Sequence, residues 1–181
     1  MAKYITRRWE NYINHQKYSE CQLVTALNAY YYLTGKQYCK PFSDEYEELV
    51  DLCAARHGSA IFINKIHKKL NLEITEKHKF IEGFFYDDDM NRKNTKLPLP
   101  INAVIHHRLT GFHSVLIVDH IVKCEAVRVA NFRYETRNGW IFINDLKLYA
   151  SPCFSGDDGI NSKGKKWNFR LYKLKNGISD E

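Results

Sequence analysis

The hydrophobic positions near the start of the chain recur at helical spacing. Residues 19–35 predict a helix with one apolar face, because their apolar side chains lie three or four positions apart. Ser19 and Gln22 have the spacing of a capping box at the start of this helix, and Gly35 follows its end. The predicted apolar face consists of Leu23, Ala26, Leu27, Tyr30 and Tyr31.

Two further helices are predicted before residue 72. Ser43 is a candidate N-cap, and the two acidic residues after it suit the positive end of a helix dipole. The helical pattern that it begins continues to a stop at Gly58. Ser59 then begins a third pattern, which ends at Asn71. The N-terminal part of the chain is therefore expected to contain three helices in succession.

The remainder of the chain consists of β-branched and aromatic segments separated by turn residues. A short strand is expected from Leu72, and the polar stretch 80–100 is expected to be a loop or excursion. The strand candidates that follow are 101–108, 113–120, 126–132, 139–144 and 167–174. Helices followed by strands predict an α+β fold, with N-terminal helices packed on a C-terminal antiparallel β-sheet.

The length and the charge of the chain limit its domain organisation and its possible binding partners. The 181 residues, 44% of them hydrophobic, predict one globular domain spanning residues 1–181. The formal charge of +6 is scattered between acidic clusters, and the chain contains no recognisable nucleic-acid-binding motif. Nucleic acid is therefore not favoured as a partner. No apolar run approaches membrane-spanning length, so no membrane association is expected.

The five cysteines indicate a reducing compartment. Their number is odd, they contain no CxxC pair, and no signal-sequence pattern opens the chain. Free thiols and a cytoplasmic location are the expectation.

One of these cysteines, Cys21, falls in the first turn of the first predicted helix. Unpaired backbone N–H groups and the helix dipole stabilise an anion there, and the thiolate is the nucleophilic form of cysteine. Cysteines at helix starts are also often simple core residues, so the position requires a base before it indicates catalysis.

His113 is the histidine best placed to act as that base, because His120 is expected in a turn and His67 is expected to be a surface or cap residue. His113 stands at the start of the most apolar predicted strand, where a side chain lies at the rim of the sheet. Asn131 ends the next predicted strand, where its amide could orient an imidazole. Asp119 is the competitor for this role, but it lies at the far end of the His113 strand, about 20 Å away at the rise of a β-strand.

The order of cysteine, histidine and asparagine resembles that of papain-like cysteine peptidases. The closest resemblance is to the bacterial branch that removes double-glycine leaders from exported peptides, and to its stand-alone relatives. The matching stretches are Glu20-Cys21-Gln22, the segment PINAVIHHRLTGFHSVLIVD and Asn131-Phe132. Gln22 and Phe132 are departures, because the branch has glycine after the cysteine and proline after the third residue.

The resemblance also implies an oxyanion-hole glutamine six residues before the cysteine. His15 occupies that position, and Gln16 is one residue nearer, so Gln16 is the candidate donor to the oxyanion. The implied fold is papain-like, with Cys21, His113, Asn131 and Gln16 as the catalytic residues.

The implied activity is a cysteine hydrolase that cleaves a peptide or isopeptide bond in a peptide or protein substrate. The same triad order also serves glutamine transglutaminases and deamidases, and a disarmed scaffold could act as a binding module. His106, His107, His120 and Cys124 have the chemistry of zinc ligands, but their spacing matches no recognised metal motif. No metal or cofactor is expected.

Overall fold

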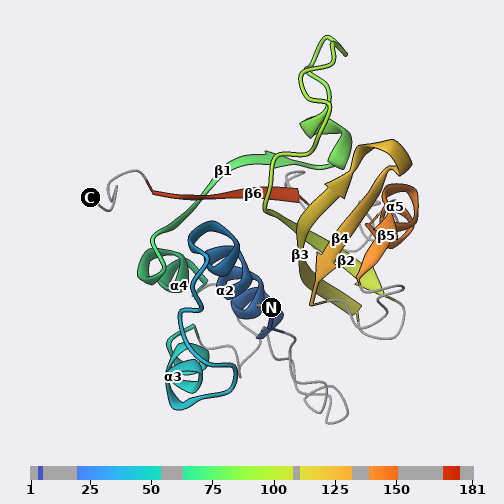
Figure 1. Ribbon diagram of the computed structural model, residues 1–181. Coiled ribbons are helices and arrows are strands. Elements are labelled where there is room, and N and C mark those ends of the chain that lie inside the picture. The colour runs from blue at the N-terminus through green and yellow to red at the C-terminus, as the bar shows by residue number, and fades with distance from the viewer. Residues whose placement is uncertain are drawn as a thin grey trace, which may run out of the picture.

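The computed structural model describes residues 4–5, 20–53, 63–107, 111–131, 139–150 and 169–175. Within these ranges, the backbone alone is described for residues 105–107, 111–113 and 147–150. The described part has an α+β architecture, in which helices lie against an antiparallel sheet (Figure 1). The expected fold class is confirmed at this level.

Within the described residues, the sheet has six strands in the order β1-β6-β2-β3-β4-β5, and every neighbouring pair is antiparallel. The last of these strands along the chain therefore lies between the first and the second. The strands are β1 (Leu72–His78), β2 (Ile101–His107), β3 (Gly111–Ile121), β4 (Ala126–Ala130), β5 (Trp140–Phe142) and β6 (Phe169–Leu174).

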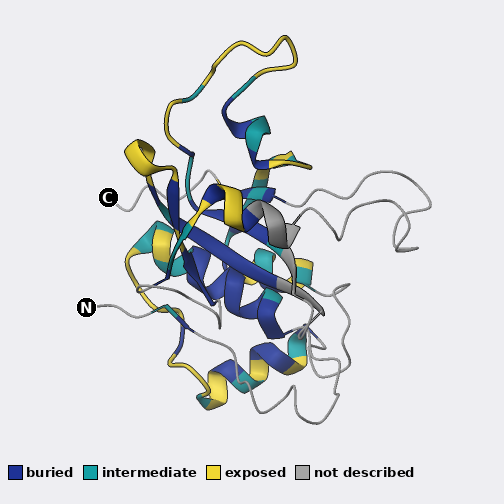
Figure 2. Cartoon of the chain, turned by 90° about the vertical axis from the view of Figure 1, so that its right-hand side faces the viewer, coloured by how far each residue is buried: buried dark blue, intermediate teal, exposed yellow. Residues whose placement is uncertain are grey.

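Helices cover both faces of this sheet. Leu116 and Val118 of β3 pack in a cluster with α2 (Glu20–Thr34), α3 (Asp44–Leu52) and α4 (Ile63–Lys69). Val115 and Ile117, which alternate with them, pack in a second cluster with α5 (Ile143–Ala150). The sheet is thus apolar on both sides, and Figure 2 shows buried residues along both α2 and the strands.

The helix α2 lies at the centre of the first cluster. Every residue from Glu20 to Ala29 is buried except Gln22, so this part of the helix is enclosed rather than apolar on one face only. Asn28 fixes the N-terminal segment to it, because its side chain both accepts from the Ile5 N–H (2.7 Å) and donates to the Ile5 carbonyl (2.9 Å).

The predicted helix boundaries are partly confirmed. Ser43 is the N-cap of α3, and its Oγ accepts from the Tyr46 N–H. This helix ends at Leu52 instead of Gly58, with Cys53 as C-cap donating its N–H to two carbonyls of the last turn. Asn71 follows α4 in the left-handed conformation that commonly ends helices, as predicted. Ser19, Gly58 and Ser59 lie outside the described residues.

The helix α5 is a correction to the sequence prediction. The expected strand 139–144 ends at Phe142, and the chain turns at Ile143 into a helix that buries Ile143 and Leu146. The helix arises because the face of the sheet with Val115 and Ile117 is as apolar as the other face and requires a cover.

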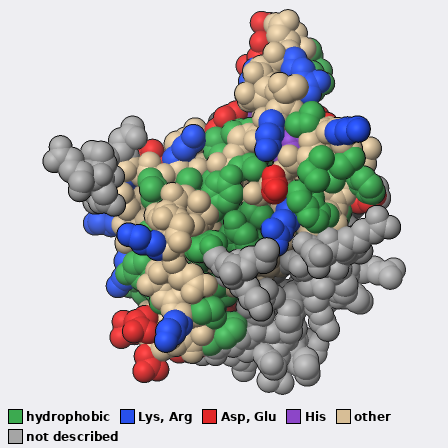
Figure 3. Space-filling view, in the orientation of Figure 1, with side chains coloured by type: hydrophobic (Ala, Val, Ile, Leu, Met, Phe, Trp, Pro, Cys, Tyr) green, Lys and Arg blue, Asp and Glu red, His purple; other side chains and the backbone are tan. Residues whose placement is uncertain are grey.

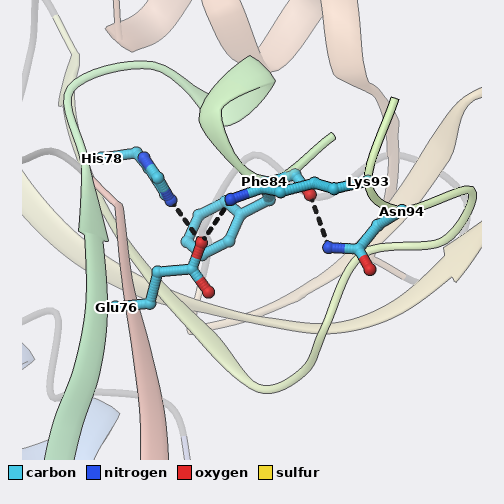
Figure 4. Close-up of polar contacts among 5 residues, drawn as sticks. All are labelled: Glu76, His78, Phe84, Lys93 and Asn94. Atoms are coloured by element: carbon cyan, nitrogen blue, oxygen red, sulfur yellow. Dashed lines mark hydrogen bonds and ion pairs between the residues drawn. The ribbon is translucent and has the colours of Figure 1, made fainter. Parts of the chain in front are cut away.

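The polar stretch 80–100 is an excursion from the sheet, as expected, with one 3-10 turn, η2 (Ile81–Phe84), at its base. Glu76 of β1 accepts hydrogen bonds from His78 (2.5 Å) and from Lys93 of the returning limb (2.9 Å), and Asn94 donates to the Phe84 carbonyl (Figure 4). Figure 3 shows acidic side chains at the tip of this excursion and over α3.

Candidate active site

Cys21 is the second residue of α2, as the sequence predicts, and its exposure is 7%. The residue before it, Glu20, is also buried, and its Oε1 accepts a hydrogen bond from the hydroxyl of Tyr46 (2.8 Å). Tyr46 belongs to α3 and is fully buried. The start of α2 is therefore held by a carboxylate–hydroxyl contact to a second helix, which the sequence pattern did not reveal.

A chain of buried polar side chains joins α2 to the sheet one turn beyond Cys21. Ser114 of β3 donates its hydroxyl to Thr25 Oγ1 (3.1 Å) and accepts from Asn102 Nδ2 of β2 (2.6 Å). All three residues are at most 4% exposed. Buried hydroxyl and amide groups require such partners, so this contact fixes which part of α2 lies on which part of β3.

The electrostatic effect of Asp119 on Tyr32 indicates the direction of α2 along β3. The pKa of Tyr32 is raised by burial and by the carboxylate of Asp119, so the end of the helix lies near the end of the strand. The start of the helix then lies beside the start of β3. Cys21 precedes Thr25 by four residues, about 6 Å of helix, which corresponds to about two strand residues. From Ser114, this distance brings Cys21 level with residues 112–113.

His113 is the third residue of β3, and its backbone pairs with Ile105 of β2. Its side chain lies outside the described part, so the sequence expectation that it meets Cys21 stays a prediction. The strand begins two residues before His113, at Gly111. The position of His113 near one end of an apolar central strand is as the sequence indicated. Position 113 alternates with Ser114, however, and therefore belongs to the face of β3 that carries Val115 and Ile117, opposite the face that carries α2.

Asn131 directly follows β4, the strand that pairs with β3, as predicted. It is 1% exposed, and its Nδ2 donates to the backbone carbonyl of Ser114 (3.3 Å). Its φ of 65° is in the left-handed region, which asparagine tolerates better than most residues. The third candidate residue therefore contacts the residue next to His113.

Asp119 lies at the opposite end of β3, as the sequence indicated. Its Oδ1 accepts from the His120 backbone N–H (2.8 Å) and lies 4.0 Å from Lys96 Nζ. Gln16 and His15, the two candidates for the oxyanion position, lie outside the described residues.

Two histidines differ from their predicted surroundings. His120, expected in a turn, lies in β3 and is 2% exposed, because the strand continues to Ile121. Its Nδ1 accepts from the Leu97 N–H (3.1 Å), and burial lowers its pKa. His67, expected at the surface, is half-buried and contacts the Tyr172 hydroxyl (2.9 Å). Burial and the nearby Arg170 and Lys175 lower the pKa of His67 to about 4.

The thiols in the described part differ in burial. Cys21, Cys39 and Cys53 are buried, Cys124 is exposed, and Cys153 lies outside the described part. Burial, followed by Glu45, raises the pKa of Cys39, which disfavours its thiolate. Among the described residues no group of three or more potential ligands could hold a metal ion.

Comparison with known proteins gives no further assignment, because no family model, curated protein or solved structure matches the chain. None of the helices in the described ranges combines the length and the apolar character that crossing a membrane requires.

Proposed function

We propose that the chain is a papain-like cysteine hydrolase that cleaves an amide bond in a peptide or protein. The observation that supports this most is the placement of α2 on the sheet. Cys21 is the second residue of the helix, the Thr25–Ser114 contact sets the helix on β3, and Asn131 donates to the carbonyl beside His113. Cys21, His113 and Asn131 thus belong to three separate elements near one end of the sheet, and the proposal requires the imidazole of His113 to reach the α2 side of β3.

The proposed chemistry begins with proton transfer from the Cys21 thiol to His113. The thiolate attacks the substrate carbonyl carbon and forms a C–S bond, and the tetrahedral oxyanion accepts hydrogen bonds from the Cys21 backbone N–H and from Gln16. As the intermediate collapses, the C–N bond breaks and His113 protonates the leaving amine. Water, deprotonated by His113, then hydrolyses the thioester, which releases the acid and restores the thiol.

Asn131 has a positioning role in this proposal. Its amide would hold the imidazole of His113 in the tautomer that presents the other ring nitrogen to the sulfur. The helix start contributes to thiolate formation through its unpaired N–H groups and its dipole.

The pH dependence of Cys21 alkylation by iodoacetamide tests this function without a known substrate. Peptide mapping of the native protein should show Cys21 modified first at pH 6, with an inflection well below the roughly 8.5 of a free thiol. His113→Ala should move that inflection toward the free value, and Asn131→Ala should move it less. Gln16→Ala should leave alkylation unchanged, because an oxyanion donor acts only when a carbonyl is attacked. The proposal is wrong if Cys21 reacts no faster than Cys124 and its profile is the same in His113→Ala.

If Cys21 is reactive, a second experiment must distinguish hydrolysis from deamidation. Hydrolysis of a peptide or isopeptide bond releases two chain fragments, whereas deamidation of a glutamine side chain releases ammonia with the chain intact. Incubation with a casein digest, followed by mass spectrometry and an ammonia assay, separates these two reactions of the same triad.

A further inference from the structure

The pairing of β2 with β3 places a histidine of β2 on the face of the sheet that carries α2. The two strands pair without a register shift over the whole of β2. Neighbours along a strand alternate between its faces, and residues directly opposite each other in a pair share a face. Asn102 belongs to the α2 face, because its side chain donates to the Ser114 hydroxyl, which in turn donates to Thr25 of α2. Counting by two from Asn102 assigns position 106 to the same face.

The buried residues around Asn102 agree with this assignment of faces. Its neighbours Ile101 and Ala103 belong to the cluster that contains α5. Leu116, which lies opposite Asn102 on β3, belongs to the cluster that contains α2. Positions 105 and 107 therefore belong to the α5 face, and position 106 belongs to the α2 face.

Position 106 is also level with Cys21 along the sheet. From the contact between Thr25 and Ser114, one helical turn brings Cys21 level with residues 112–113 of β3. His106 pairs with Phe112, whereas His113 pairs with Ile105. His106 and His113 are thus both at the end of the sheet near the start of α2, but on opposite faces.

We propose that His106 is the imidazole that accepts the proton of Cys21. The inference rests on the proposed function, a hydrolase in which Cys21 is the nucleophile, and it changes one assignment within that function. With His106 as the base, the thiol and the imidazole come from two elements on the same side of the sheet. The requirement that the imidazole of His113 reach the α2 side of β3 is then removed.

The atoms of the reaction balance with His106 in this role. The Cys21 thiol transfers its proton to the ring, the sulfur forms a bond to the substrate carbonyl carbon, and the ring returns the proton to the leaving nitrogen as the C–N bond breaks. The ring then takes a proton from water, whose oxygen attacks the thioester carbonyl. That proton returns to the sulfur as the C–S bond breaks.

The test compares neighbouring histidines of one strand by the pH profile of Cys21 alkylation in the full chain. His106→Gln should raise the inflection by about 1 pH unit or more. It should also lower the iodoacetamide rate at pH 6 by about 10-fold, because the thiolate fraction falls tenfold for each unit. His107→Gln is the matched control, since it removes the same group from the adjacent position on the opposite face, and it should leave the profile unchanged. His113→Gln should raise the inflection less than His106→Gln does.

A second measurement leaves the strand unaltered. Circular dichroism and urea midpoints show whether each glutamine variant is folded under assay conditions. Imidazole NMR signals of the unaltered protein and of Cys21→Ser give the same answer if His106→Gln does not fold. His106 should titrate at lower pH in Cys21→Ser, because the thiolate that favours its charged form is absent, and His107 should titrate as before.

The outcomes separate this inference from the proposed function. If Cys21 reacts no faster than Cys124 and its profile is the same in His106→Gln and His113→Gln, the function is overturned, and this assignment with it. A fast reaction at Cys21 with an equal or larger shift in His113→Gln overturns the assignment of His106 alone. An unchanged profile in folded His106→Gln, or an unchanged His106 titration in Cys21→Ser, has the same consequence. An equal shift in His107→Gln also overturns the assignment, because the effect would then not depend on the face.

Discussion

Both faces of the sheet are apolar, but the helix layer on the α2 face also contains buried polar contacts, whereas the face that carries α5 is mostly a close-packed apolar layer. On the first face, Glu20, Thr25 and Asn28 of α2 make buried hydrogen bonds, to α3, to β3 and to the segment at Ile5 respectively. On the second face, Phe84, Val115 and Leu146 belong to a cluster of aromatic and aliphatic side chains. Cys21, the proposed nucleophile, belongs to the helix on the first face, and α5 packs on the second.

The two faces therefore contribute in different ways: apolar packing mainly stabilises the fold, and buried hydrogen bonds mainly fix the position of α2. Burial of apolar surface stabilises a fold by about 25 cal/mol per Å² and places little demand on direction. A buried hydrogen bond contributes only about 1 kcal/mol net, but it costs more than that when its partner is removed. We therefore expect apolar substitutions behind the sheet to change stability most, and polar substitutions in front of it to change the position of α2.

The largest effect should come from Phe84→Ala. Phe84 is fully buried in the apolar cluster, so its loss should lower the free energy of unfolding by about 3–5 kcal/mol. Urea unfolding measures this change. Phe142→Ala is the control, because that ring is 55% exposed and should change stability by less than about 0.5 kcal/mol. If folded Phe84→Ala also shifts the Cys21 alkylation profile, the two faces are not independent and the comparison fails.

A smaller effect is expected for Tyr46→Phe on the polar face. The change removes the hydroxyl that Glu20 accepts from and should cost about 2 kcal/mol, since a buried carboxylate loses a donor while the ring stays in place. Tyr38→Phe removes a hydroxyl from a ring that is 37% exposed and should be nearly neutral. Urea midpoints of the two variants give the difference. Equal midpoints would show that the Glu20–Tyr46 contact does not stabilise the start of α2.

The smallest effect, about 1 kcal/mol, should come from the protonation of His67. Its pKa is about 4 in the folded protein against the usual 6.5, so below pH 6.5 the unfolded chain binds a proton that the folded chain does not. Stability is therefore retained above pH 6.5 and lost as pH falls toward 4. Partial exposure of the ring reduces the loss below the value that the full shift implies.

Comparison of the protein with His67→Gln isolates this term. The free energy of unfolding should fall more steeply in the unaltered protein between pH 6.5 and pH 4. The pKa of His120 is also lowered by burial, but His120 is present in both proteins and cancels. Parallel curves would mean that His67 gains its proton in the folded state as easily as in the unfolded state.

The sequence predicted those elements whose signals are local. Ser43 as a cap, the start of β2 at Ile101 and the position of Asn131 after β4 all follow from the residues at those places. The helix α5 was missed because Trp140–Phe142 is a strand and Ile143 continues the same β-branched pattern. The sequence did indicate that the sheet is covered on both faces, because apolar residues in β3 run from Val115 to Val118 without alternation.

The candidate site was predictable only as a set of residues. The positions of Cys21 at the helix start and of Asn131 beside the β3 strand follow from the order of the elements. The hydrogen bond from Ser114 to Thr25 joins residues 89 positions apart, and it depends on how the helix lies across the sheet. No local pattern encodes that placement. The same reason explains why His120 was expected in a turn, since its burial depends on Leu97 from the distant excursion.

The left-handed backbone at Asn131 has a consequence for how this chain can diverge. A φ of 65° is readily adopted by glycine, asparagine and aspartate and is costly for branched side chains. Two of these three residues are those whose side chains can orient an imidazole. The backbone conformation at position 131 therefore restricts which substitutions are tolerated before any selection on activity acts. A library of all residues at position 131, sorted only for folded protein, should therefore be enriched in asparagine and aspartate as well as glycine.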